Sequence, residues 1–151
     1  VNLIDEDFIK EQLNLAKAQK PDLICVSMHW GIEYQTTQNA TQENLANFLF
    51  QNGVDIILGS HPHVLQPMEK RSVVLDDGTQ KECFVIYSLG NFMSGQTAKN
   101  TQTSIILNID ILKDDLTRKE EDIEEKNKSI LFHMFQFICT NLVLANKNIV
   151  F

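Results

Sequence analysis

Two histidines flank a proline in the segment GSHPHVLQP, residues 59–67, which directly follows the apolar run VDIIL, residues 54–58. Neutral imidazole is a common ligand for zinc and related metals. Side chains two positions apart in an extended segment point the same way, and Pro62 is expected to hold that shape. The spacing therefore predicts that His61 and His63 address one metal site. The alternative is an extended turn that carries imidazoles by chance.

Polar residues also follow two other predicted strands, in HWGIEY, residues 29–34, and in SLGNF, residues 88–92. Ligands of α/β sheets bind in the crevice beyond the carboxyl ends of the strands. This rule places His29 and Asn91 at the same rim as the histidine pair. A single histidine at a strand end is more often satisfied or exposed, so the prediction depends on the three segments together.

Two further residues of these segments could assist such a site. Glu33 is either a carboxylate that orients an imidazole or handles a proton, or an exposed side chain without a role. Gly59 is expected to let the backbone turn sharply or approach a ligand closely.

The elements that position these residues alternate along the chain. Asp5 is a predicted N-cap for a helix that Pro21 ends, and the apolar run 22–28 suits a strand buried on both faces. Thr41 is the predicted cap of a second helix, and the run 54–58 is a second buried strand. The order helix, strand, helix, strand predicts an α/β fold with parallel neighbouring strands.

The second half of the chain changes this order. Residues 68–75 and 81–88 flank the turn signal Asp76-Asp77-Gly78, which predicts a hairpin, and residues 104–112 are expected to form another strand. The sheet should therefore be mixed. Residues 113–128 are a charge run with a capping-box pattern, which is typical of a solvated segment with a short exposed helix. The apolar run 130–144 is expected to form a buried helix or a strand pair.

Composition restricts the class of protein. The chain has 151 residues, 43% of them hydrophobic, which suffices for one globular domain with a core. The net charge of −7, without a basic cluster, argues against nucleic acid as a partner. The three cysteines form no CxxC pair and are expected to be small buried hydrophobic residues. We expect the chain to be a piece of a longer protein, because it starts at Val1 and shows no signal or transmembrane segment.

Three ordered segments, HWGIEY, NGVDIILGSHPHVLQP and VIYSLGNF, resemble the bacterial poly-γ-glutamate capsule biosynthesis family, called CapA-like. That family is related to the calcineurin-like metallophosphoesterases. The resemblance covers about residues 5–112 and implies an α/β fold with a mixed β-sheet and flanking helices, like the C-terminal half of a metallophosphoesterase sandwich. Residues 1–112 would be the C-terminal part of that domain. Residues 113–151, a charged segment and an apolar tail, are left without an assigned role.

The resemblance also implies roles for the site residues. His61 and His29 would share one divalent ion of the manganese, zinc or iron class, and His63 would reach a second. Asn91, with Gly59 and Gly90, would surround these ligands and hold them in position. Glu33 or a rim histidine would protonate a leaving group. The substrate would be an anionic polymer or a phosphoester, at the bacterial cell surface or outside the cytoplasm.

The sequence departs from the superfamily pattern in one respect. The superfamily also needs an early aspartate, a bridging aspartate and an Asn-His pair, and none of these is found upstream of His29. The expected dinuclear site is therefore incomplete, and we expect the chain by itself to be inactive as a hydrolase. It could also pair with a second copy through surface left by a missing N-terminal half. The alternatives are a non-catalytic module of capsule assembly or export, and a structural remnant.

Overall fold

The computed structural model describes residues 4–111, 130–132 and 142–145 of the chain. The chain divides into two compact units. The described residues of the first unit are 4–105 and 142–145, and those of the second are 106–111 and 130–132. All of the candidate site residues lie in the first unit.

The first unit is built on a five-stranded mixed sheet with the order β3-β4-β2-β1-β7. β1, β2 and β4 are parallel, whereas β3 and β7 run antiparallel to their neighbours. The strands are β1 (Leu23–His29), β2 (Ile56–Ser60), β3 (Met68–Val74), β4 (Gln80–Ile86) and β7 (Leu142–Ala145). The α/β class, the mixed sheet, the parallel pairing of the first two strands and the hairpin between β3 and β4 are thereby confirmed.

Two helices, α1 (Glu6–Ala18) and α2 (Ala40–Gln51), are capped by side chains. Asp5 caps α1 as predicted, and its carboxylate accepts a hydrogen bond from the Phe8 amide at 3.0 Å. The prediction that Thr41 caps α2 is wrong, because the cap is Asn39. Asn39 and Gln42 each accept a hydrogen bond from the other's backbone N–H, and this reciprocal capping box satisfies two donors that Thr41 would leave open.

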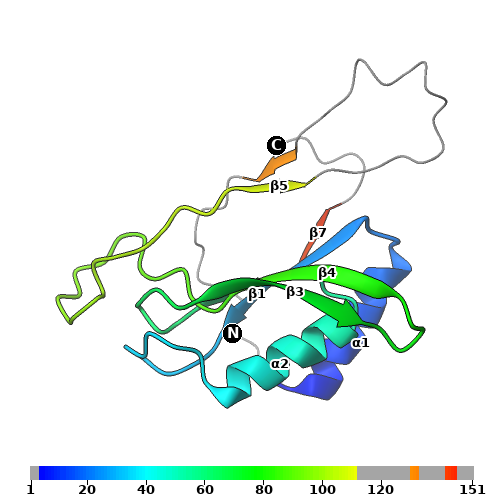
Figure 1. The fold of residues 1–151 in the computed structure, drawn as a ribbon, viewed down its shortest axis with the longest axis horizontal. Coiled ribbons are helices and arrows are strands. Elements are labelled where there is room, and N and C mark those ends of the chain that lie inside the picture. The colour runs from blue at the N-terminus through cyan, green and yellow to red at the C-terminus, as the bar shows by residue number, and fades with distance from the viewer. Residues whose placement is uncertain (1–3, 112–129, 133–141, 146–151) are drawn as a thin grey trace. The chain divides into compact units, whose positions relative to one another are not determined.

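Both helices pack on the same face of the sheet (Figure 1). One buried cluster contains side chains from α1, α2 and alternate positions of β1, together with Trp30 and Tyr87 beyond the ends of β1 and β4. Fully burying a large apolar side chain contributes about 1.5–3 kcal/mol. This cluster therefore fixes the sheet under the helices, and with it the strand ends that carry the histidines. Neither described helix is long and apolar enough to cross a membrane.

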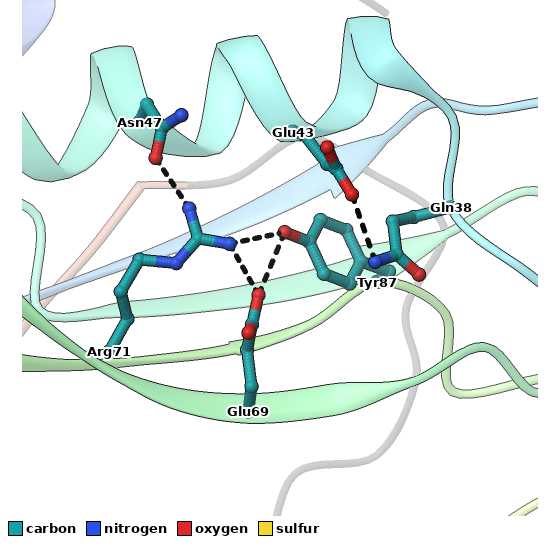
Figure 2. A network of polar contacts seen from close by, with 6 residues as sticks. All are labelled: Gln38, Glu43, Asn47, Glu69, Arg71 and Tyr87. Carbon is teal, nitrogen blue, oxygen red and sulfur yellow. Dashed lines mark hydrogen bonds and ion pairs between the residues drawn. The ribbon is translucent and has the colours of Figure 1, made fainter.

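A polar network connects α2 to the edge strand β3 (Figure 2). The Arg71 guanidinium on β3 donates to the side chains of Asn47 and Glu69, and to the Tyr87 hydroxyl at 3.0 Å. That hydroxyl donates to Glu69 at 3.1 Å, and the guanidinium lies over the Phe50 ring, 5.9 Å from its centroid. Both terminal nitrogens of Arg71 thus donate to side chains of the fold, so this network has a structural role.

The second unit contains a two-stranded sheet of β5 (Ile109–Ile111) and β6 (Ile130–Phe132). The predicted strand 104–112 is therefore wrong over most of its length. Ser104 makes only an isolated bridge to Gly90, and regular pairing begins at Ile109, where β6 supplies a partner. A strand forms where a partner offers hydrogen bonds, and the local pattern does not specify this. The short exposed helix predicted within residues 113–128 lies outside the described residues.

Candidate metal site

His61 and His63 lie in a bend that begins where β2 ends. Their φ angles are 100° and 60°, so the prediction of an extended segment is wrong. Such angles cost a non-glycine residue roughly 1–3 kcal/mol and persist only where surrounding contacts impose them. One such contact is the hydrogen bond from the Tyr34 amide to the Pro62 carbonyl, 2.8 Å long. The bend leaves the two imidazole centroids 6.1 Å apart.

His29 ends β1 and reaches the same place from the neighbouring strand, because it is in register with Ser60 of β2. Its ring centroid is 4.5 Å from that of His61. The three histidines therefore converge, as their positions after parallel strands predicted. Desolvation, and then the charges of His61 and His63, lower the pKa of His29. This favours the neutral imidazole, which is the form that binds a metal.

Glu33 joins the histidines from the loop after β1. Its Oε1 lies 3.9 Å from Nε2 of His63, and one ligand atom each from Glu33, His61 and His63 lies within 4.8 Å of the others. Zinc binds imidazole and carboxylate at about 2.0–2.2 Å, so two ligand atoms on one ion are separated by roughly 3–4 Å. Small rotations of the exposed Glu33 side chain and of the two half-buried imidazoles would bring the three atoms to that separation. The donor set fits a divalent ion.

Asn91 supports this site from the end of the fourth strand. Its Oδ1 lies 2.8 Å from Nδ1 of His63, and its Nδ2 donates to Gln96 Oε1 at 2.9 Å and to the Thr101 carbonyl at 3.1 Å. Gly90 precedes it at φ 74°, and a Cβ there would lie 2.8 Å from the Thr103 carbonyl oxygen. The glycine therefore lets the backbone direct Asn91 at the histidine.

Of the two roles predicted for Gly59, the sharp turn is wrong, and the close approach to a ligand stays a prediction. It lies inside β2 and makes no sharp turn, but a Cβ there would lie 2.0 Å from the Tyr87 carbonyl oxygen and 2.6 Å from Nε1 of Trp30. The Trp30 indole donates to that carbonyl at 2.8 Å. The glycine thus makes room for the hydrogen-bonded indole and carbonyl, two residues before His61 in the chain.

Two buried glutamines, which no sequence pattern indicated, hold the loop that carries Glu33. Gln66 donates from its side-chain nitrogen to the carbonyls of Gln35 at 2.9 Å and Thr37 at 3.1 Å. Its Oε1 accepts a hydrogen bond from Gln42 of α2 at 2.9 Å. A glutamine offers no periodicity signal, and only the folded chain shows that this pair fastens the loop to the helix.

The chain is similar in sequence to bacterial proteins of capsule synthesis. Residues 1–96 match the family model described as bacterial capsule synthesis protein PGA_cap. Over 107 residues the chain is 36% identical to "Capsule biosynthesis protein CapA" of Bacillus anthracis, covering 69% of this chain and 24% of that protein. It is also 36% identical over 107 residues to "PGA biosynthesis protein CapA" of Bacillus subtilis (strain 168), covering 70% and 26%. The chain thus spans about a quarter of these relatives. No solved structure matches.

Proposed function

The chain belongs to the bacterial capsule synthesis protein PGA_cap family, and from this premise we propose that it supplies part of a divalent-metal centre used in poly-γ-glutamate capsule biosynthesis. The observation that carries the proposal is the convergence of the ligand atoms of Glu33, His61 and His63 within 4.8 Å of one another. All three residues lie within the part of the chain that matches the family. We propose further that the chain acts at the bacterial cell surface.

In this proposal two imidazoles and one carboxylate hold the ion, a donor set that suits zinc, manganese or iron. His29, beside His61, is assigned as an additional ligand. A divalent ion supplies a Lewis acid that lowers the pKa of water and offsets the charge of an anionic group. We assign Glu33 as a metal ligand rather than as a proton donor, because its Oε1 lies 3.9 Å from Nε2 of His63.

The charge of the site supports a metal-dependent interaction with an anion. The three segments 29–34, 59–67 and 88–92 contain no lysine or arginine, whereas Glu33 contributes a negative charge. A polyglutamate chain or a phosphoester would be repelled by such a site until a cation occupies it. We therefore propose that binding of the anionic substrate requires the ion.

The test is metal titration of the full chain after dialysis against a chelator. We expect Zn²⁺ or Mn²⁺ to bind one ion per chain, and His61→Ala to abolish this binding. The matched control is His133→Ala, which removes the histidine outside the three segments and should leave binding unchanged. Failure to bind either ion, or equal losses in both variants, would overturn the proposal.

A second measurement separates catalysis from assembly. The metal-loaded chain is mixed with poly-γ-glutamate, and separately with a chromogenic phosphodiester. We expect metal-dependent binding of the polymer without turnover of the ester, since three histidines and one carboxylate are too few ligands to bridge two ions and complete the coordination of both. Two tightly held ions per chain with turnover would show that the site is complete and that the single-ion form of the proposal is wrong.

A further inference from the structure

We propose that Asn91 is a positioning residue that fixes His63 in the tautomer with its proton on Nδ1, so that the Nε2 lone pair faces Glu33. The tautomer follows from hydrogen bonds within the chain alone. Its consequence for metal affinity rests on the proposed function.

The Thr101 backbone carbonyl determines which end of the Asn91 amide is the nitrogen, because this carbonyl can accept a hydrogen bond but cannot donate one. The Thr101 backbone carbonyl lies 3.1 Å from one end of the amide, and a carbonyl oxygen can only accept, so that end is the nitrogen. The oxygen of the amide therefore faces His63, 2.8 Å from Nδ1. Because an amide oxygen cannot donate either, Nδ1 must carry the proton. The opposite tautomer would place two lone pairs against each other at hydrogen-bond distance.

The second ring nitrogen of His63 then has no proton in the neutral ring. It lies 3.9 Å from Oε1 of Glu33, beyond hydrogen-bond range, and both atoms are acceptors. Two facing acceptors are stabilised by a cation between them. Hydrogen bonding at one ring nitrogen commonly sets which nitrogen binds a metal, and Asn91 does this here.

The loop that follows Asn91 keeps the amide in place. Thr101 is buried, with 1% of its surface exposed, and its hydroxyl lies 2.7 Å from the Ala98 carbonyl and 3.1 Å from the Gln96 carbonyl. The carbonyl of the same residue accepts from Asn91. The amide is therefore held before any ion binds, and His63 does not have to reorient when one arrives.

The test is the protonation of the His63 ring in the metal-free full chain. With ¹⁵N-labelled histidine at about pH 8.5, where ordinary imidazoles are neutral, two-bond ¹H–¹⁵N spectra show which ring nitrogen carries the proton. A His63→Gln chain assigns the signal. We expect the proton on Nδ1 in the parent chain and in Asn91→Asp, which keeps an acceptor, and a loss of this preference in Asn91→Leu.

A control separates the tautomer from the rigidity of the loop. Thr101→Val removes the hydroxyl bonds of the loop but keeps the backbone carbonyl that orients Asn91, so it should preserve the tautomer. A proton on Nε2 in the parent chain would overturn the inference, as would an unchanged tautomer in Asn91→Leu.

Zinc titration of the same variants tests the consequence. Asn91→Leu should weaken zinc binding about 10–100-fold, the usual cost of removing a hydrogen-bond partner of a metal ligand, and Thr101→Val, which keeps the carbonyl that orients Asn91, should weaken it less. If His63 shows the expected tautomer but the parent chain binds no zinc, the proposed function fails and the assignment of Asn91 stands. If zinc binds equally well to Asn91→Leu and to the parent chain, the positioning role is refuted.

Discussion

Replacing Gly59 with alanine tests how closely the sheet and the site are joined. The new methyl group would lie 2.0 Å from the Tyr87 carbonyl oxygen and 2.6 Å from the Trp30 indole nitrogen, far inside van der Waals contact. The nearest obstacle is backbone, which cannot rotate away as a side chain can. Either β2 separates from the segment after β4, or the indole leaves its position.

The magnitude follows from two costs. Forcing an extra methyl into a packed core costs about 1–3 kcal/mol. Breaking the 2.8 Å bond from the indole of Trp30 to Tyr87 leaves a buried donor and a buried acceptor unpaired, which adds about 1–3 kcal/mol. We expect the free energy of unfolding to fall by roughly 3–5 kcal/mol, a large part of the ~5–15 kcal/mol typical of a domain.

Urea denaturation followed by tryptophan fluorescence is the appropriate assay, because Trp30 is the single tryptophan of the sequence and lies at the perturbed contact. The matched control is Gly95→Ala, where an added Cβ meets no atom within 4 Å. That variant should change the free energy of unfolding by at most about 0.5 kcal/mol. If Gly59→Ala were as stable as the parent chain, or Gly95→Ala equally damaging, the packing argument would be wrong.

Three further outcomes are expected. Gln66→Ala should lower the free energy of unfolding by roughly 2–4 kcal/mol, since it leaves buried polar partners unpaired, whereas the exposed control Gln80→Ala should change it little; equal losses in urea denaturation would contradict this. In a Cys139→Ser chain, a thiol reagent should modify the folded protein only as it opens, because burial raises the pKa of Cys25 to about 12; fast stoichiometric labelling would refute it. Burial also raises the pKa of Tyr87 from 10.0 to about 12. The stability that Tyr87 contributes is therefore complete below pH 10 and is lost as the pH rises from 10 to 12. A Tyr87→Phe chain that loses as much stability over this range would show that the loss has another cause.

The sequence alone identified β1, β2 and the hairpin of β3 and β4, and it predicted where their polar ends meet. The runs at 22–28 and 54–58 have no polar alternation, so they predict strands covered on both faces, and two parallel strands necessarily end at one edge. That reasoning placed His29 beside His61 without any contact being known. The hairpin around Gly78 could also be predicted from the sequence, because the turn of a β-hairpin depends on local backbone preferences.

Only the tertiary structure decided the directions of the side chains within the loops. His61 and His63 converge through positive φ angles rather than through the extended segment that Pro62 suggested, and contacts distant in sequence impose those angles. Glu33 faces His63 because Gln66, remote in sequence, fastens its loop. Local preferences are short-range terms that identify a strand or a turn. The direction of a loop side chain depends on hydrogen bonds to partners tens of residues away, and no local sequence pattern encodes these bonds.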